Sequence, residues 1–319
     1  MSRINCSALA LVARQPIREH ALTTHKEQRH DPRKTNAPQA WQLDPLVLDD
    51  QIRAFLREDI GYFDLTATLL IDAELPGRFE MRAREPMTLA GLAAAARVFT
   101  FYDASIQVEV LARDGQQVDK GTTLLKIEGP ARSILTAERT ALNLAQHLSG
   151  IATVTATYIE RIAGTRAQLI DSRKTTPGLR AMEKHAVACG GGRNHRLGLD
   201  NGIMLKDNHI AVCGSITAAV ARARSSVPVL TKVEVECDRF DQVEEALAAG
   251  ADVIMLDNMA VEEMQRAVAM VDGRVLLEAS GGVRLETIRA IAETGVDFIS
   301  VGRITQSSPA LDIGLDDAE

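Results

Sequence analysis

Aromatic side chains are scarce in this sequence, since Phe, Trp and Tyr together make up 3% of its 319 residues. Stacking of bases on aromatic rings is therefore excluded as a main means of binding nucleic acid. No apolar run approaches the roughly 18 residues that span a bilayer, so we expect no membrane-spanning segment. We predict a protein that binds neither nucleic acid nor a membrane.

Cysteine pairs with the spacing of a zinc or redox site are also missing. The four cysteines are far apart and form no CxxC motif: Cys6, Cys189, Cys213 and Cys237. Their spacing argues against a zinc site built from cysteines and against a disulfide framework. We interpret them as reduced thiols of a cytoplasmic protein.

The first 44 residues differ from the rest of the chain. Basic residues outnumber acidic ones there, although the whole chain has a formal net charge of −7. Asp31-Pro32 and Ala37-Pro38 interrupt regular structure. We predict a disordered or loosely attached extension over residues 1–44, with an organelle transit peptide as the alternative.

Ordered structure is expected to begin at Asp44-Pro45, where a capping residue precedes a proline in the first helical turn. A strand-rich region follows and includes residues 77–90 and 106–111. A long helical pattern, Ser133–Ile162, comes next and links this region to the second half of the chain.

From Ala167 onward, short apolar runs alternate with helical patterns. The predicted strands are Gln168–Asp171, Gly202–Lys206, Thr231–Glu236, Asp252–Leu256, Val275–Glu278 and Phe298–Val301. The predicted helices between the later strands are Ile216–Ala223, Phe240–Ala249, Val261–Met270 and Leu285–Thr294. The last four strands recur about every 22 residues, a suitable length for one strand-loop-helix-loop unit.

Such repeating units form a parallel sheet with right-handed crossovers. About six strands favour an incomplete α/β barrel over an open doubly wound sheet. No GxGxxG follows the first strand, which argues against dinucleotide binding. We therefore assign residues 45–150 to an N-terminal domain and residues 151–319 to a barrel domain, whose last residues are free to pack back on the N-terminal domain.

Charged residues and glycines follow the predicted strands where each strand ends. They are Arg173, Lys174, Lys206, Glu236, Asp257, Ser280, Gly281, Gly282 and Gly302. In a barrel the carboxyl ends of the strands meet at one rim, where active sites lie. The early strands contribute cations, the middle strands acids, and the late strands glycines that open onto a helix and let backbone N–H groups approach a phosphate.

The cations belong to a basic stretch, residues 171–209, in an otherwise acidic protein. A local cluster of this kind predicts a pocket for a small polyanion rather than a nucleic-acid surface. The alternative is a solvated basic loop. Glu236 and Asp257 could cap the helices that follow them, or could hold ribose hydroxyls or Mg²⁺.

With these residues the sequence resembles the quinolinate phosphoribosyltransferase family over about residues 45–315. The matching motifs, in order, are Glu138–Asn143, DSRKTTPGLR (171–180), GGGRNHR (190–196), KDNH (206–209), VEVEC (233–237), LDN (256–258), EASGG (278–282) and SVG (300–302). The resemblance implies an N-terminal α/β sandwich followed by an incomplete α/β barrel. It also implies transfer of phosphoribose from phosphoribosyl pyrophosphate to quinolinate, with Mg²⁺ as cofactor, giving nicotinate mononucleotide, pyrophosphate and CO₂ in NAD biosynthesis.

The resemblance also implies a role for each candidate residue. Quinolinate would be bound by Arg139 of a neighbouring subunit and by Arg173, Lys174, His195 and Arg196. The phosphoribosyl part and its metal would be held by Lys206, Glu236 and Asp257, with the metal ligated directly or through water. The 5′-phosphate would be bound by Ser280, Gly281, Gly282 and Gly302. Shared sites of this kind imply a homodimer or a dimer-based hexamer.

The chemistry fits these residue types. Quinolinate has two adjacent carboxylates, and arginine binds such groups through paired hydrogen bonds. Departure of pyrophosphate leaves positive charge on the sugar, which nearby carboxylates stabilise. We assign Lys174, Lys206, Glu236 and Asp257 as catalytic, with Lys174 stabilising the carbanion formed by loss of CO₂.

Three other functions remain open from the sequence. A molybdenum-associated paralogue of the same fold would keep the phosphoribosyl half and take a different acceptor. A barrel aldolase would use Lys206 to form a Schiff base. A sensor of pyridine carboxylates would bind the ligand without releasing CO₂.

Overall fold

The structure is a computed structural model that describes residues 43–318. The predicted extension over residues 1–44 therefore lies outside the described residues, apart from Leu43 and Asp44. Helix α1 (Pro45–Ile60) begins where the sequence predicted, because the Asp44 side chain accepts a hydrogen bond from the Leu46 N–H and caps the helix.

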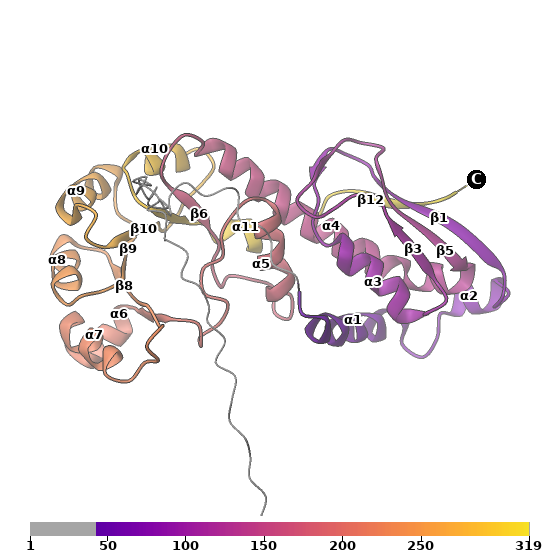
Figure 1. The fold of residues 1–319 in the computed structure, drawn as a ribbon, viewed down its shortest axis with the longest axis horizontal. Coiled ribbons are helices and arrows are strands. Elements are labelled where there is room, and N and C mark those ends of the chain that lie inside the picture. The colour runs from indigo at the N-terminus through magenta and orange to yellow at the C-terminus, as the bar shows by residue number, and fades with distance from the viewer. Residues whose placement is uncertain (1–42, 319) are drawn as a thin grey trace, which may run out of the picture. The chain divides into compact units, whose positions relative to one another are not determined.

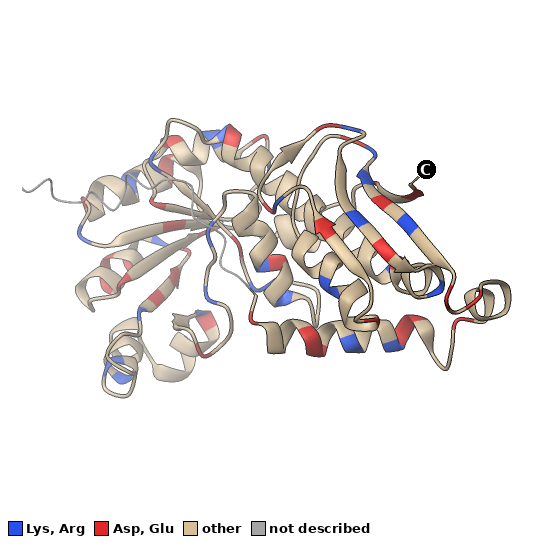
Figure 2. Cartoon of the chain, turned by 45° about the vertical axis from the view of Figure 1, so that its right-hand side comes forward, with Lys and Arg blue, Asp and Glu red and all other residues tan. Residues whose placement is uncertain are grey.

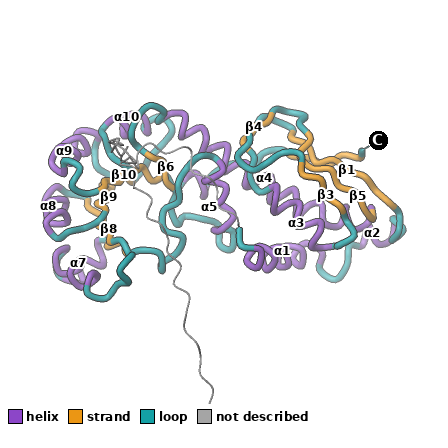
Figure 3. The backbone as a smooth tube through the Cα atoms, viewed as in Figure 1, coloured by secondary structure: helices purple, strands orange, loops and turns teal. Residues whose placement is uncertain are grey.

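The N-terminal part combines an antiparallel sheet with helices. Strand order in the sheet is β12-β1-β5-β3, and the remaining two strands, β2 and β4, pair with each other. The strand bounds are β1 Pro76–Ala83, β2 Met87–Thr88, β3 Gln107–Val110, β4 Gln117–Val118, β5 Thr123–Pro130 and β12 Ile313–Asp317; the helices are α2 Leu65–Leu70 and α3 Leu92–Tyr102. Because β12 pairs with β1, the last residues of the chain belong to this sheet (Figure 3).

One long helix, α4 (Ala131–Arg161), contacts both parts of the fold (Figure 1). It packs on α3 and β5 from the N-terminal sheet region and on α5 (Arg180–Cys189) from the second half. Its buried residues include Ala137, Ala141 and Leu148, whose spacing places them on one face of the helix. The helix crosses residue 150, so the change from one part to the other occurs inside a continuous element.

The second half contains the predicted parallel sheet. Its order is β6-β11-β10-β9-β8-β7, and each pair of neighbouring strands is parallel. The strands are β6 Gln168–Ile170, β7 Ile203–Leu205, β8 Val233–Cys237, β9 Val253–Asp257, β10 Leu276–Ser280 and β11 Phe298–Ser300. All six strands lie within two residues of the predicted bounds, because buried apolar runs mark them clearly in the sequence.

The barrel is incomplete because β6 and β7 form opposite edges of the sheet and do not pair with each other within residues 43–318. The chain after α5 runs beside β6 instead. There Arg193 exchanges backbone hydrogen bonds with Leu169 and Asp171 and forms an isolated parallel bridge with Ile170. Arg193 thus extends the open edge of the sheet by one paired residue.

Helices lie outside the strands in this half (Figure 1). They are α6 Asp207–Cys213, α7 Ile216–Arg224, α8 Phe240–Ala248, α9 Val261–Val271, α10 Ile288–Glu293 and α11 Arg303–Gln306. The predicted helices at α7 to α10 are present. The sequence did not predict α5, α6 or α11, because α5 is charged and the other two are short.

No helix within residues 43–318 combines the length and apolar character that a bilayer crossing needs. Lys and Arg are interspersed with Asp and Glu along the helices in this part of the chain (Figure 2). On α1, for example, Asp49 and Asp50 precede Arg53 and Arg57. This mixture is typical of a solvated helix surface.

Candidate active site

A cavity of about 710 Å³ opens at the carboxyl ends of the six parallel strands. It contains every barrel residue that the sequence analysis selected: Arg173, Lys174, His195, Arg196, Lys206, Glu236, Asp257, Ser280, Gly281, Gly282 and Gly302. The register explains the convergence, because Asp257 pairs with Ser280 across β9 and β10 at the ends of both strands. Arg139 is outside this group. It lies on α4, exposes more than half of its side chain and does not line the cavity.

Two arginines, Arg173 and Arg196, line the cavity together and lie close enough for their charges to interact. Burial and the neighbouring charge of Arg173 lower the pKa of Arg196. Arg196 is held in place by a hydrogen bond from Nη1 to the Gly202 carbonyl, 3.2 Å away. The Nε atom of Arg173 is buried and has no hydrogen-bond partner among residues 43–318. A buried donor without an acceptor beside a second cation is the arrangement expected of a site that binds an anion.

A buried ion pair holds the backbone in place at the start of the basic stretch, residues 171–209. The ammonium of Lys184 on α5 donates to Asp171 at the end of β6, and neither side chain is exposed. Asp171 also accepts from the Asn194 side chain at 2.7 Å and from the His195 N–H at 2.8 Å. Asp171 therefore fixes the backbone that carries His195 and Arg196.

His195 connects the cavity to two buried carboxylates. Its Nε2 lies 3.0 Å from Glu234 Oε2 and 3.4 Å from Glu278 Oε2. Burial lowers the pKa of His195, but the hydrogen bonds to these two carboxylates outweigh it and raise the pKa overall. The second ring nitrogen has a different contact. The backbone N of Arg196 lies 2.7 Å from His195 Nδ1 and donates its N–H to it, so Nδ1 must carry a lone pair. A protonated Nδ1 would place two N–H groups against each other at that distance, so the single ring proton lies on Nε2, facing the two carboxylates.

The two acids that contact His195, Glu234 and Glu278, differ in the cavities that they line. Glu278 lines the large cavity, and burial raises its pKa to about 7. Glu234 lines a second cavity of about 230 Å³, which also borders His195, Arg196 and Glu278. One oxygen of each acid, Oε1, is buried without a hydrogen-bond partner in the described part of the chain.

The acids on the middle strands face the large cavity. Lys206 Nζ donates a hydrogen bond to Glu236 Oε2, which places an ammonium and a carboxylate side by side. Asp257 Oδ2 accepts from the Asn258 side chain at 2.7 Å. Carboxylate oxygens at the mouth of a polar cavity are the donors that Mg²⁺ prefers. A second group that can hold a metal ion consists of His195, Glu234 and Glu278, which is mostly buried.

At two glycines where the backbone lines the cavity, a Cβ would collide with a neighbouring side chain. A Cβ at Gly281 would lie 2.2 Å from Asn258 Oδ1, and its φ of +93° is strained for other residues. A Cβ at Gly302 would lie 2.7 Å from Lys174 Cδ, so Lys174 packs directly over this glycine. Both glycines therefore lie against neighbouring side chains that leave no room for a Cβ, and their expected contact with a phosphate stays a prediction.

One expected feature of the glycine segment was wrong. Ser280-Gly281-Gly282 does not open onto a helix, because a turn separates it from α10, which begins only at Ile288. The helix after Gly302, α11, has four residues. Binding of a phosphate here would therefore depend on loop N–H groups and nearby side chains rather than on a long helix dipole.

The sequence analysis missed several lining residues. Arg284 and Arg303 add two cations beside the late glycines. They follow β10 and β11 in the chain, so the strand-end rule could have found them. Glu234 precedes Glu236 by two positions on β8, and residues spaced by two share a face of a strand. The two-residue spacing from Glu236 could therefore have identified Glu234 as a buried acid next to the site.

Comparison with known proteins agrees with this geometry. Residues 64–149 match the family described as quinolinate phosphoribosyl transferase, N-terminal domain, and residues 151–316 match the corresponding C-terminal domain. A probable nicotinate-nucleotide pyrophosphorylase [carboxylating] from Synechocystis sp. is 43% identical over 273 residues, which cover 85% of this chain and 92% of that protein.

Two further relatives have the same character. A nicotinate-nucleotide pyrophosphorylase [carboxylating] from Mycobacterium leprae is 44% identical, with 84% of this chain and 96% of that protein covered. The solved structure of the nicotinate-nucleotide pyrophosphorylase from Francisella tularensis is 41% identical and superposes with a TM-score of 0.84, covering 89% of this chain and all of that one. The chain therefore belongs to the quinolinate phosphoribosyl transferase family.

Proposed function

We propose that this chain transfers phosphoribose from phosphoribosyl pyrophosphate to quinolinate and releases pyrophosphate and CO₂, forming nicotinate mononucleotide for NAD biosynthesis. The observation that carries the proposal is the pairing of Arg173 with Arg196 in one cavity with Glu236 and Asp257. Two converging cations suit an acceptor with two adjacent carboxylates, and the acids beside them suit a sugar that gains positive charge.

The acceptor half of the site would orient quinolinate. Arg173 has a free buried donor, and Arg196 is fixed by Gly202 and by the Asp171-supported backbone. Together with Lys174 they would hold both carboxylates and direct the ring nitrogen toward the sugar carbon. Both ring nitrogens of His195 have contacts within the chain, so His195 would act by positioning Arg196 rather than by donating freely to the ligand.

The phosphoribosyl half would lie over the middle and late strands. Glu236 and Asp257 would stabilise the positive charge that develops on the ribose as pyrophosphate departs. Gly281, Gly282 and Gly302 would present backbone N–H groups to the 5′-phosphate, with Ser280 beside them and Arg284 and Arg303 as added cations. Lys206 would neutralise charge on the departing pyrophosphate.

Mg²⁺ fits the donors present in this half. Glu236 and Asp257 offer hard oxygen ligands at the cavity mouth, and either would hold the ion directly or through water. When bound, Mg²⁺ supplies charge neutralisation for the pyrophosphate group. Lys174 would then stabilise the carbanion that remains on the pyridinium ring when CO₂ leaves.

A homodimer, or a hexamer built from dimers, would complete the site. Support comes from exposed apolar side chains on and around α2, namely Tyr62, Phe63, Leu65, Leu69 and Leu70. Thr136 on α4 donates to Asp64, the N-cap of α2, and Arg139 follows Thr136 by three residues. Arg139 therefore lies near this apolar face, where a second copy would receive it.

Mixing two inactive variants tests the shared site. Arg139→Ala removes the donated cation, and Asp257→Asn damages the receiving site. If Arg139 acts across the interface, mixed dimers contain one intact site, and random exchange restores about one quarter of the wild-type activity. Absence of any recovery, with exchange verified by mass spectrometry, would place Arg139 outside the partner's site.

The identity of the pyridine acceptor, quinolinate or nicotinate, determines which reaction the chain catalyses. Purified protein, phosphoribosyl pyrophosphate and Mg²⁺ are mixed with either quinolinate or nicotinate, and the products are separated by chromatography. We expect nicotinate mononucleotide from quinolinate alone. Turnover of nicotinate in place of quinolinate would assign the chain a different reaction.

A further inference from the structure

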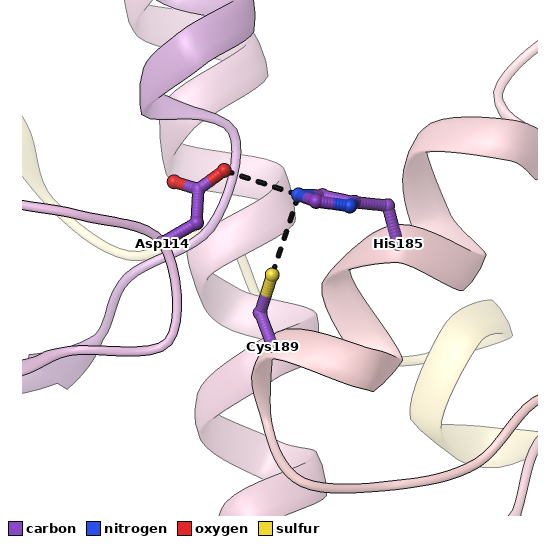
Figure 4. Close-up of side chains that lie close together, drawn as sticks. All are labelled: Asp114, His185 and Cys189. Carbon is purple, nitrogen blue, oxygen red and sulfur yellow. Dashed lines mark hydrogen bonds and ion pairs between the residues drawn. The ribbon is translucent and has the colours of Figure 1, made fainter. Parts of the chain in front are cut away.

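A second group of chemically reactive side chains lies away from the active-site cavity. Asp114, in the loop between β3 and β4, approaches His185 and Cys189 on α5 (Figure 4). One ligand atom from each residue lies within 4.8 Å of the other two. None of the three lines the large cavity, so the group has no part in the proposed phosphoribosyl transfer.

The contacts converge on a single nitrogen. His185 Nε2 is 3.1 Å from Asp114 Oδ2 and 3.3 Å from Cys189 Sγ. A Cys-His-Asp catalytic triad has a different geometry, because the acid and the nucleophile contact opposite nitrogens of the imidazole. A thiol, an imidazole nitrogen and a carboxylate oxygen that all lie within 4.8 Å of one another are close enough to bind a single metal ion.

We propose that Asp114, His185 and Cys189 bind a zinc ion that links the β3–β4 loop to α5. Thiolate and imidazole ligands together favour Zn²⁺ over Mg²⁺ or Ca²⁺, which prefer oxygen. Three protein ligands leave a fourth position for water.

The spacing requires only a small adjustment. In a tetrahedral zinc site, bonds of about 2.0–2.3 Å separate the ligand atoms by roughly 3.3–3.6 Å. The observed separations of 3.1 Å and 3.3 Å are a few tenths of an ångström shorter, so the ligands need to move apart slightly to admit the ion. His185 and Cys189 are one helical turn apart on α5, which places both side chains on the same face.

The surroundings hold the ligands in place. Asp114 Oδ1 accepts a hydrogen bond from the Leu92 N–H at 2.9 Å, which leaves Oδ2 directed at His185. Such a contact to the second carboxylate oxygen is typical of metal ligands. Gly115 has a φ of +84°, and a Cβ there would lie 3.3 Å from the Cys189 carbonyl. The loop therefore approaches the end of α5 closely enough for one ion to reach both.

A proton is the competing occupant of this site. Burial disfavours a charged imidazole, but the contacts with Asp114 and Cys189 outweigh burial and raise the pKa of His185 to about 10. The metal must displace that proton. Binding is therefore measured at pH 8 on the full chain after treatment with a chelator.

Cobalt is the direct probe, because Zn²⁺ has no visible spectrum and Co²⁺ takes the same ligands. We expect one equivalent of Co²⁺ to produce a sulfur-to-cobalt charge-transfer band together with the intense visible bands of tetrahedral cobalt. Cys189→Ser abolishes the charge-transfer band. The matched controls Cys6→Ser, Cys213→Ser and Cys237→Ser keep it. His185→Gln and Asp114→Asn weaken Zn²⁺ affinity at least about tenfold.

A second measurement needs no variant. Zn²⁺ should protect Cys189 from alkylation in the wild-type protein, while the partly exposed Cys213 remains reactive; mass spectrometry of peptides reports both. A charge-transfer band that survives in Cys189→Ser would overturn the proposal. So would cobalt binding without any such band. Because Cys189 is buried, alkylation is followed under conditions in which it reacts without Zn²⁺, and an equal rate with Zn²⁺ would also overturn the proposal.

Discussion

Lys184 and Asp171 form an ion pair that is fully buried, with neither side chain exposed to solvent. Removal of one member of a buried pair leaves the other charge uncompensated. Lys184→Met should therefore destabilise the fold by about 3–5 kcal/mol, measured as a lower urea midpoint. Lys126→Met, at an exposed position on β5, is the matched control and should change stability by less than about 0.5 kcal/mol. If the two variants are equally stable, the Asp171–Lys184 pair does not stabilise the fold that supports the site.

The paired arginines make a prediction about substrate affinity. Arg196→Ala should raise the KM for quinolinate about 10- to 100-fold, since a hydrogen bond to a charged group contributes about 1.5–3 kcal/mol. The KM for phosphoribosyl pyrophosphate should change much less. Arg193→Ala is the control, because Arg193 is exposed, contacts Gln168 and does not line the large cavity. Equal effects on both substrates would argue against separate halves of the site.

Substitution of Gly281 is expected to weaken substrate binding by more than backbone strain alone would. Gly281→Ala places a Cβ against Asn258 and should reduce affinity for phosphoribosyl pyrophosphate as well as stability. Gly250→Ala separates the two effects, because Gly250 has a similar φ of +78° with nothing within 4 Å of its Cβ. We expect it to lose about 1 kcal/mol of stability and no substrate affinity. If Gly281→Ala behaves like Gly250→Ala in both assays, the close approach of Gly281 to Asn258 has no role in binding.

Glu278 makes the active site sensitive to pH. Burial raises its pKa to about 7 from 4.5, so protonation favours the folded state. This stabilisation is complete below about pH 4.5 and disappears as the pH rises through 7. The same ionisation adds negative charge to a cavity that would bind a dianion, so the KM for quinolinate should increase from pH 6 to pH 8. Glu278→Gln should flatten this profile, whereas an unchanged profile would assign the pH dependence to another group.

The sequence predicted the barrel and its rim because both have strong local signals. Each parallel strand is a short buried apolar run, and the residue that follows such a run must lie at the rim. Asp257 and Gly302 were found in this way. Their convergence follows from the topology and needs no knowledge of side-chain packing.

Other features could not be predicted because their cause is not local. Lys184 and Asp171 are separated by 13 positions, and a charged residue in a sequence is normally interpreted as exposed. For the same reason, the sequence did not predict the contact between His185 and Asp114, which are 71 positions apart. Arg139 matched the family motif, yet it lies on α4 outside the cavity. Its proposed role across a subunit interface needs a partner chain, which one sequence does not describe.

The coupling of transfer to decarboxylation is tested most directly by counting products. Quinolinate labelled in its 2-carboxylate is incubated with phosphoribosyl pyrophosphate and Mg²⁺, and released CO₂ and pyrophosphate are measured together. We predict one CO₂ for each pyrophosphate and no CO₂ when phosphoribosyl pyrophosphate is omitted. Pyrophosphate release without CO₂, or CO₂ release from quinolinate alone, would contradict the proposal that one cavity joins the two chemistries.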